Sequence, residues 1–187
     1  SIFEKCRSAN VSLEKKGSNK KFKIFPMIIG IFIENYKKGG VDTFLKNLLH
    51  KRIKGNQIYL ITNKNNPGLD IINKKKVKII YYSVFSWDNI FNNYNNTYLL
   101  FICKIFYSFL FPLTFLYQII KLYLILKKID LNSAMIVNGG YPGGDLCLAA
   151  SLVLPKINQN QKVWMNFHNI ALPKYKSLLL NFYKNFI

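Results

Sequence analysis

Apolar runs of strand length alternate with segments of helical periodicity after Lys21, and this alternation limits the possible folds more than any other feature. A parallel sheet covered by helices on both faces produces such a pattern. We therefore expect an α/β fold with a doubly wound, Rossmann-like, mostly parallel sheet, in which the first and fourth strands lie side by side where the strand order reverses. The predicted strands are residues 23–33, 57–62, 77–82, 134–138 and 163–167, and the predicted helices are 41–53, 99–128, 145–154 and one from 173.

The 187 residues suit a single domain. Residues 1–21 are polar and basic and are expected to form a poorly ordered lead-in, and residues 22–187 form the domain. Because the sequence stops within the apolar, helix-like residues 178–187, we expect a domain that is truncated at its C-terminal end and belongs to something longer.

Lysine dominates the charge of the chain. Lys and Arg number 27 against 8 Asp and Glu, a formal net charge of +19, yet Arg7 and Arg52 are the only arginines. Proteins that read nucleic-acid sequence depend on Arg for bidentate contacts, so no specific nucleic-acid binding is expected. A Lys-rich surface is instead attracted to anionic lipids and phosphorylated substrates. Cys6, Cys103 and Cys147 lack Cys-x-x-Cys spacing and are interpreted as reduced thiols of a cytoplasmic protein, which would be peripheral if it contacts the inner face of a membrane.

Residues 99–120 form an apolar run that is long enough to cross a bilayer. Pro112 is expected to break this run into two shorter helices. A narrow polar stripe follows the run at helical spacing: Lys104, Ser108, Thr114, Gln118 and Lys121. This stripe favours helices buried in a soluble domain, with an interfacial helix pair and a transmembrane span as open alternatives. If part of the pair is exposed, its apolar side can enter the headgroup region while anionic phosphates meet nearby lysines, namely Lys104, Lys121, Lys127 and Lys128.

The loops after the first, fourth and fifth strands are the candidate site, because ligands of parallel sheets bind beyond the carboxyl ends of the strands. In the first loop, Gly39 and Gly40 precede a helix, where backbone N–H groups and the helix dipole attract anions. The alternative is a tight turn in which Asp42 stabilises the first helical turn. Neither G-x-x-x-x-G-K-[ST] nor G-x-G-x-x-G occurs, which argues against a P-loop enzyme and a standard dinucleotide site.

The other two loops offer side chains for a sugar and for proton transfer. Tyr141 can stack on a sugar ring and Asp145 can accept hydrogen bonds from hydroxyls, unless this loop is a connector whose Asp145 only caps the next helix. His168 leaves the fifth strand and can donate to a developing negative charge, or it is a structural histidine. No general base can be assigned, and Glu34 and Asp145 are the carboxylates nearest the crevice. The scattered His and Cys residues and the missing Asp-x-Asp predict no metal site.

Together these features resemble the N-terminal half of the glycosyltransferase family 4 enzymes, which have the GT-B fold. The resemblance covers residues 22–187 and rests on the buried first strand, on GGVDTF at 39–44 opening a helix, on GNQIYLIT at 55–62, on ID at 129–130 and on residues 163–169 ending in His-Asn. Asp42 stands where the family often has Glu, and Asn138-Gly139 replaces the His or aromatic residue frequently found after the fourth strand.

The resemblance implies that Gly39 and Gly40 approach the diphosphate of a nucleotide-sugar donor and that His168 is catalytic, near the reacting centre. Residues for the acceptor or the sugar are then expected in the later loops: Asn138, Gly139, Tyr141, Asp145 and Asn169. The implied partners are the donor, a glycan or lipid-linked acceptor, and a C-terminal nucleotide-binding domain that this chain lacks. The apolar residues 99–125 and the net charge of +19, in contrast, are the basis for expecting an anionic membrane surface as a further partner. No metal and no cofactor besides the nucleotide sugar are expected.

The predicted function is therefore that of the N-terminal part of a retaining glycosyltransferase, a part that is inactive alone because it lacks most of the donor site. Two alternatives are a non-catalytic acceptor-binding or membrane-docking half that needs a separate donor-binding chain, and an unrelated nucleotide-binding α/β module. The reading frame beyond Ile187 distinguishes the retaining glycosyltransferase from the non-catalytic half. A fold without an open crevice at His168 would favour the nucleotide-binding module.

Overall fold

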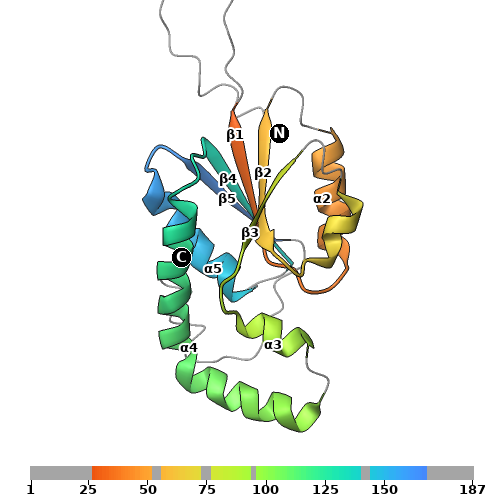
Figure 1. The fold of residues 1–187 in the computed structure, drawn as a ribbon, viewed down its shortest axis with the longest axis vertical. Helices are drawn as coiled ribbons and strands as arrows, with labels where there is room; N and C mark the ends of the chain where they lie inside the picture. The colour runs from red at the N-terminus through yellow and green to blue at the C-terminus, as the bar shows by residue number, and fades with distance from the viewer. Residues whose placement is uncertain (1–26, 52–55, 73–76, 94–95, 140–143, 168–187) are drawn as a thin grey trace, which may run out of the picture.

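The computed structural model describes residues 27–51, 56–72, 77–93, 96–139 and 144–167, which form one five-stranded sheet with helices on both faces (Figure 1). All of its paired strands are parallel, and their order is β3-β2-β1-β4-β5. The elements along the chain are β1 (Ile28–Ile33), α2 (Gly40–Lys51), β2 (Gln57–Asn63), the 3-10 helix η1 (Pro67–Ile71), β3 (Lys78–Tyr82), α3 (Trp87–Asn93), α4 (Thr97–Leu126), β4 (Ser133–Asn138), α5 (Asp145–Ile157) and β5 (Lys162–Phe167).

The predicted α/β fold is confirmed, including the position of the reversal in strand order. β1 lies between β2 and β4, and its Ile31 is opposite Leu60 on one side and Met135 on the other. The order runs outward from β1 to β3 and from β4 to β5, so the switch point lies between β1 and β4. This is where a doubly wound sheet offers a ligand site.

Two cores cover the two faces of the sheet. Ile31 and Ile33 of β1 pack against α2 and η1 on one face, while Phe32 packs toward α4 and α5 on the other. Figure 1 shows α2 and α5 on opposite sides of the strands. Because β1 is buried on both faces, its sequence is a continuous apolar run instead of an alternating one.

Two features of the segment between β3 and β4 differ from the predictions. Residues 83–96, which none of the predicted strands and helices covers, contain α3, whose start is fixed by the Asp88 N–H donating to Ser86 Oγ at 3.2 Å. The predicted break at Pro112 is wrong, because α4 continues through this proline as one 30-residue helix. The ribbon of α4 bends partway along its length (Figure 1), as expected of a proline that removes one backbone hydrogen bond without ending the helix.

Most of α4 is not buried in the domain, so the favoured prediction of buried helices is wrong. Only 11% of its most apolar 18-residue window is buried, at a mean hydropathy of 2.0, and by length and composition the helix is able to cross a membrane. The predicted polar stripe does not share one face, since Gln118 is fully buried while Lys104 and Lys121 are exposed. The buried side chains of α4 form a different stripe, along its C-terminal half: Phe111, Phe115, Gln118, Leu122 and Leu126.

Cys103 and Cys147 are free thiols, as expected. Cys6, the lead-in of residues 1–21 and the helix expected from 173 lie outside the described residues.

Two leucines on opposite sides of α4 test its packing. Leu122 is fully buried, so Leu122→Ala is expected to lower the free energy of unfolding by about 2–5 kcal/mol through the cavity it leaves. Leu124 is 42% exposed, and Leu124→Ala, the matched control, is expected to change it by less than about 1 kcal/mol. Chemical denaturation measures both, and equal losses would contradict the packing of α4 through its buried stripe.

Candidate functional site

The candidate site lies where β1 and β4 end. Glu34 follows β1 directly, Asn138 is the last residue of β4, and Asp145 begins α5. The first and second predicted loops meet here, because a Cβ atom at Gly139 would lie 3.5 Å from Val41 Cγ2 of α2. Tyr141, His168 and Asn169 lie outside the described residues.

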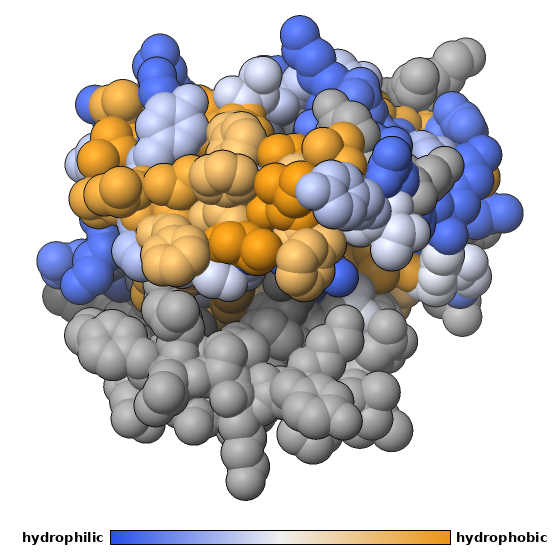
Figure 2. All heavy atoms as spheres, turned by 90° about the horizontal axis from the view of Figure 1, so that it is seen from below, coloured by the Kyte–Doolittle hydropathy of each residue, from blue (hydrophilic) through white to orange (hydrophobic). Residues whose placement is uncertain are grey.

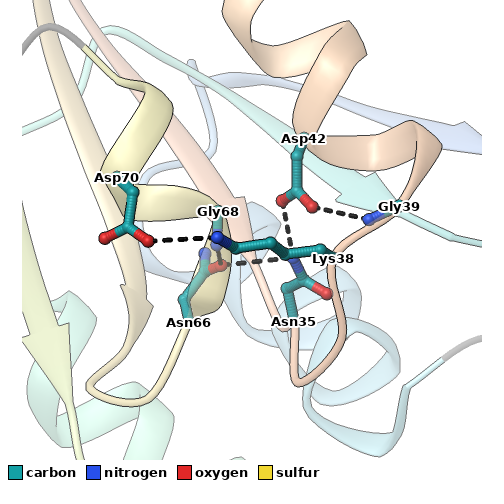
Figure 3. A network of polar contacts seen from close by, with 7 residues as sticks. All are labelled: Asn35, Lys38, Gly39, Asp42, Asn66, Gly68 and Asp70. Carbon is teal, nitrogen blue, oxygen red and sulfur yellow. Dashed lines mark hydrogen bonds and ion pairs between the residues drawn. The ribbon is translucent and has the colours of Figure 1, made fainter.

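A polar clamp around Asp42 holds the turn between β1 and α2 (Figure 3). The Asn35 side-chain amide donates to Asp42 Oδ1 at 2.7 Å and to Asn66 Oδ1 at 3.2 Å, and Asn66 Oδ1 also accepts from the Gly68 N–H at 2.8 Å. Lys38 adds an exposed ion pair with Asp70 at 3.2 Å. The turn after β1 is thereby fixed to η1, which follows β2.

Asp42 also caps α2. Its Oδ2 accepts from the Gly39 N–H at 2.8 Å, and its own N–H donates to the Gly39 carbonyl at 3.1 Å. This reciprocal arrangement satisfies donors of the first helical turn. The structure thus shows the stabilising role of Asp42. Because the Gly39 N–H is already used, a phosphate at this helix end would have to use the N–H groups of Gly40 and Val41.

The glycines of the site differ in what requires them. A side chain at Gly68 would collide with the Asp42 carboxylate, so the clamp itself needs glycine there. At Gly39 and Gly40, in contrast, an added Cβ would meet no atom of the described chain within 4 Å. The backbone of this turn is therefore open to close approach from outside.

Two carboxylates cap α5 from other parts of the chain. Glu34 Oε2 accepts from the Leu146 N–H at 3.0 Å, and Asp88 Oδ2 accepts from the Asp145 N–H at 3.1 Å. Negative charge at a helix N-terminus is favourable because of the helix dipole. The residue before the helix, Gly144, leaves the space they occupy, since a Cβ there would collide with Glu34 Oε2. Asp145 itself does not cap α5, so the predicted alternative role for it is wrong.

Burial and mutual repulsion raise the pKa values of two of these carboxyls. The pKa of Glu34 rises to about 8, first through burial and then through the charge of Asp88, and the pKa of Asp145 rises to about 7 for the same two reasons. Hydroxyl groups of Tyr36 and Ser86 donate to Glu34 Oε1 and oppose part of the rise. Carboxyls of this kind exchange protons near neutral pH.

Asp145 and Asn138 are more enclosed than a sugar-contacting role suggests. Asp145 is 6% exposed and Asn138 is 3% exposed. The Tyr107 hydroxyl of α4 lies 3.4 Å from Asp145 Oδ1, and Asp145 Oδ2 is buried without a hydrogen-bond partner in the described part of the chain. A ligand hydroxyl would reach this oxygen only after a local rearrangement.

Ser86 and Asp88 are functional candidates that the sequence did not predict, because their segment has no strand or helix periodicity that would place it beside the carboxyl ends of the strands. The place of Glu34 at the site could be predicted from the sequence, since it is a carboxylate directly after the central strand. Among the described residues, no group of three or more His, Cys, Asp or Glu side chains is placed to hold a metal ion.

Comparison with known proteins gives one distant structural likeness. No family model and no curated protein matches the chain. A crystal structure described as the glycotransferase of kitacinnamycin is similar with a TM-score of 0.44 and 8% sequence identity, over 76% of this chain and 30% of that one. The chain therefore spans about a third of the length of that protein.

The clamp predicts that two glycines respond differently to the same change. Gly68→Ala is expected to lower the free energy of unfolding by about 1–3 kcal/mol, because the new methyl group displaces the buried Asp42 carboxylate. Gly40→Ala, in open space at the first position of α2, is the control and is expected to leave stability unchanged or slightly raised. Thermal unfolding of both variants compares them. A loss at Gly40 as large as that at Gly68 would contradict the clamp.

The raised pKa values of Glu34 and Asp145 predict a loss of stability at alkaline pH. Both carboxyls bind protons more tightly when folded, so their contribution is complete below the pKa of unfolded carboxyls, about 4, and is lost as pH rises through about 7 and 8. The melting temperature is therefore expected to fall between pH 5 and pH 9. Glu34→Gln should flatten this profile, and Asp130→Asn, at an exposed position, should retain the wild-type slope. An unchanged slope in Glu34→Gln would refute the assignment.

Proposed function

We propose that this chain is the acceptor-side, N-terminal domain of a retaining glycosyltransferase of GT-B architecture. The enzyme moves a sugar from a nucleotide-sugar donor to a glycan or lipid-linked acceptor. The observation that carries the proposal is the open Gly39-Gly40 turn at the start of α2, beside the switch point between β1 and β4. The resemblance of GGVDTF at 39–44 to family 4 glycosyltransferases supports sugar transfer over other reactions at such a turn.

The chemistry requires stabilisation of negative charge on the leaving group. Breaking the bond between sugar and phosphate releases a diphosphate and leaves an oxocarbenium-like sugar. The N–H groups of Gly40 and Val41 and the positive end of the α2 dipole are suited to the diphosphate. The Asp42 clamp keeps this turn rigid, so the donors need little rearrangement during the reaction. His168 is proposed to act near the reacting centre.

Glu34 acts in this proposal as a positioning residue. It joins the end of β1 to the start of α5 through the Leu146 N–H, and thereby sets the distance between the Gly39-Gly40 turn and the loop before α5. The acceptor enters past that second loop, where Tyr141 and Gly139 are its proposed contacts. A second domain supplies the rest of the donor site, so the isolated chain is proposed to be inactive.

Graded substitutions of Gly40 test the proposed function in the protein that contains this chain. Release of nucleoside diphosphate is measured for a panel of nucleotide sugars, with a membrane extract of the source cells as acceptor. Gly40→Ala and then Gly40→Val are expected to lower kcat/KM progressively, by about tenfold or more for Val, because side chains at this position block the diphosphate. Neither change should lower the melting temperature.

Asn47→Ala, at an exposed position further along α2, is the matched control and should keep full activity. Wild-type activity in Gly40→Val would overturn the role of the turn. Sugar transfer by the 187-residue chain alone would overturn the division of the site between two domains. Failure of the longer protein to use any nucleotide sugar would refute the proposed function.

A further inference from the structure

The side of α4 that faces away from the domain is an exposed apolar surface, called here the α4 apolar face. It consists of six large side chains at spacings of three and four residues: Phe101, Ile105, Phe109, Leu113, Leu116 and Ile120. Each is between 45% and 77% exposed, with Phe109 at the upper limit. Figure 2, which views the molecule from the end where α3 and the first part of α4 lie, shows apolar side chains gathered in a continuous area. Soluble monomers rarely expose so many large side chains together, and such a face is typical of an interaction surface.

The opposite side of α4 limits what that partner can be. Phe111, Phe115 and Leu122 are buried in the core formed with α5 and the sheet. A helix that crosses a bilayer must be surrounded by lipid or by other membrane-embedded protein, and α4 would have to leave this core to do so. The helix is therefore suited to lie parallel to a membrane surface, with the α4 apolar face toward the lipid, although its length and hydropathy would permit a span.

The charges of α4 select the chemistry of the surface. The helix contains no Asp or Glu, and exposed lysines lie along it and just after it: Lys104, Lys121, Lys127 and Lys128. The ammonium groups of Lys121 and Lys127 lie 5.8 Å and 5.6 Å from the ring centroids of Tyr117 and Tyr123. Lys beside Tyr is suited to the membrane interface, where the ring meets the acyl boundary and the long Lys side chain reaches the phosphates.

We propose that the α4 apolar face docks this domain on an anionic lipid bilayer, with its large side chains in the headgroup region and the lysines of α4 on lipid phosphates. The proposal rests on the exposure, spacing and charge of α4, and it does not depend on which reaction the site performs.

Docking through α4 would also bring the candidate site to the bilayer surface. Tyr107 of α4 packs on Trp87 of α3 with ring centroids 5.7 Å apart, and its hydroxyl lies 3.4 Å from Asp145 Oδ1. Figure 1 shows α3 and the first part of α4 at the end of the molecule toward which β2 points. The site and the docking face are thus coupled through short contacts, an arrangement suited to an acceptor that is itself carried by a lipid.

Co-sedimentation with vesicles tests the docking. Vesicles of phosphatidylcholine alone and with 30% phosphatidylglycerol are used at low and high ionic strength, each with the purified protein. Binding is expected to the anionic vesicles, weakened by salt because the lysine contribution is screened, and retained in part because insertion of the apolar face is not. Absence of binding to anionic vesicles at low salt would overturn the proposal, as would equal binding to both kinds of vesicle.

Substitutions distinguish binding through the α4 apolar face from non-specific hydrophobic binding to vesicles. Phe109→Ser combined with Leu113→Ser is expected to weaken binding at least tenfold without lowering the melting temperature, because both side chains are exposed. Ile71→Ser combined with Tyr81→Ser removes two exposed apolar side chains elsewhere and is expected to bind as the wild type does. Lys121→Gln with Lys127→Gln and Lys128→Gln should remove most of the salt dependence.

Two further outcomes identify other occupants of the face. Sedimentation velocity that shows a dimer of the wild type and a monomer of the Phe109/Leu113 variant, without vesicle binding, would replace the bilayer by a second copy of the chain. Retention of the protein in membranes washed with alkaline carbonate would replace surface docking by a transmembrane span. Release by that wash, together with vesicle binding that depends on Phe109 and Leu113, supports the proposal.

Discussion

The contact between Glu34 and the start of α5 is the interaction on which the rest of the site depends. Glu34 directly follows the central strand. Its Oε2 accepts from the Leu146 N–H of α5, and its Oε1 accepts from the hydroxyl groups of Tyr36 and Ser86. Since Ser86 precedes α3 and its hydroxyl accepts from the Asp88 N–H of that helix, one carboxyl joins β1, α3 and α5. A buried negative charge is costly, and here much of that cost is avoided because burial raises the pKa of Glu34 to about 8, so that the carboxyl keeps its proton at neutral pH.

The parallel sheet was predictable from sequence because its central strands, β1 and β4, are buried on both faces. Five apolar runs separated by helical segments permit few other arrangements, and the position of β1 beside β4 followed from the usual order of such sheets. The site was predictable only where it follows directly from this order, as for the Gly39-Gly40 turn and Glu34. Asp88 reaches the site from a segment with no periodicity, and only the tertiary contact with α5 reveals it.

The glycines show why a motif in sequence does not identify its own purpose. Gly39 and Gly40, a pair before a helix, predicted an anion site from the sequence. The packing of the chain, however, requires glycine at Gly68 and Gly144, where carboxylates fill the space of a side chain. Each of these depends on a residue distant in sequence, Asp42 for Gly68 and Glu34 for Gly144. Local pattern cannot supply that information. Conversely, the open space at Gly40 means that packing within the described chain does not explain this glycine, which leaves room for the ligand contact proposed above.

The α4 helix was mispredicted for a related reason. A helix apolar all round satisfies two different demands, a core on one side and a lipid surface on the other, and both favour the same residues. The sequence of α4 therefore does not reveal which side chains face the core and which face outward. Its polar residues do not mark one exposed face, because Gln118 is fully buried with its amide donating to the Phe85 carbonyl at 3.0 Å, while Lys104 is exposed. The buried stripe from Phe111 to Leu126 contains only four of the apolar residues of α4, and many of the others are exposed. Since exposing a Leu or Phe side chain to water instead of burying it costs about 1.5–3 kcal/mol, these exposed residues favour a second apolar environment as the explanation of this helix.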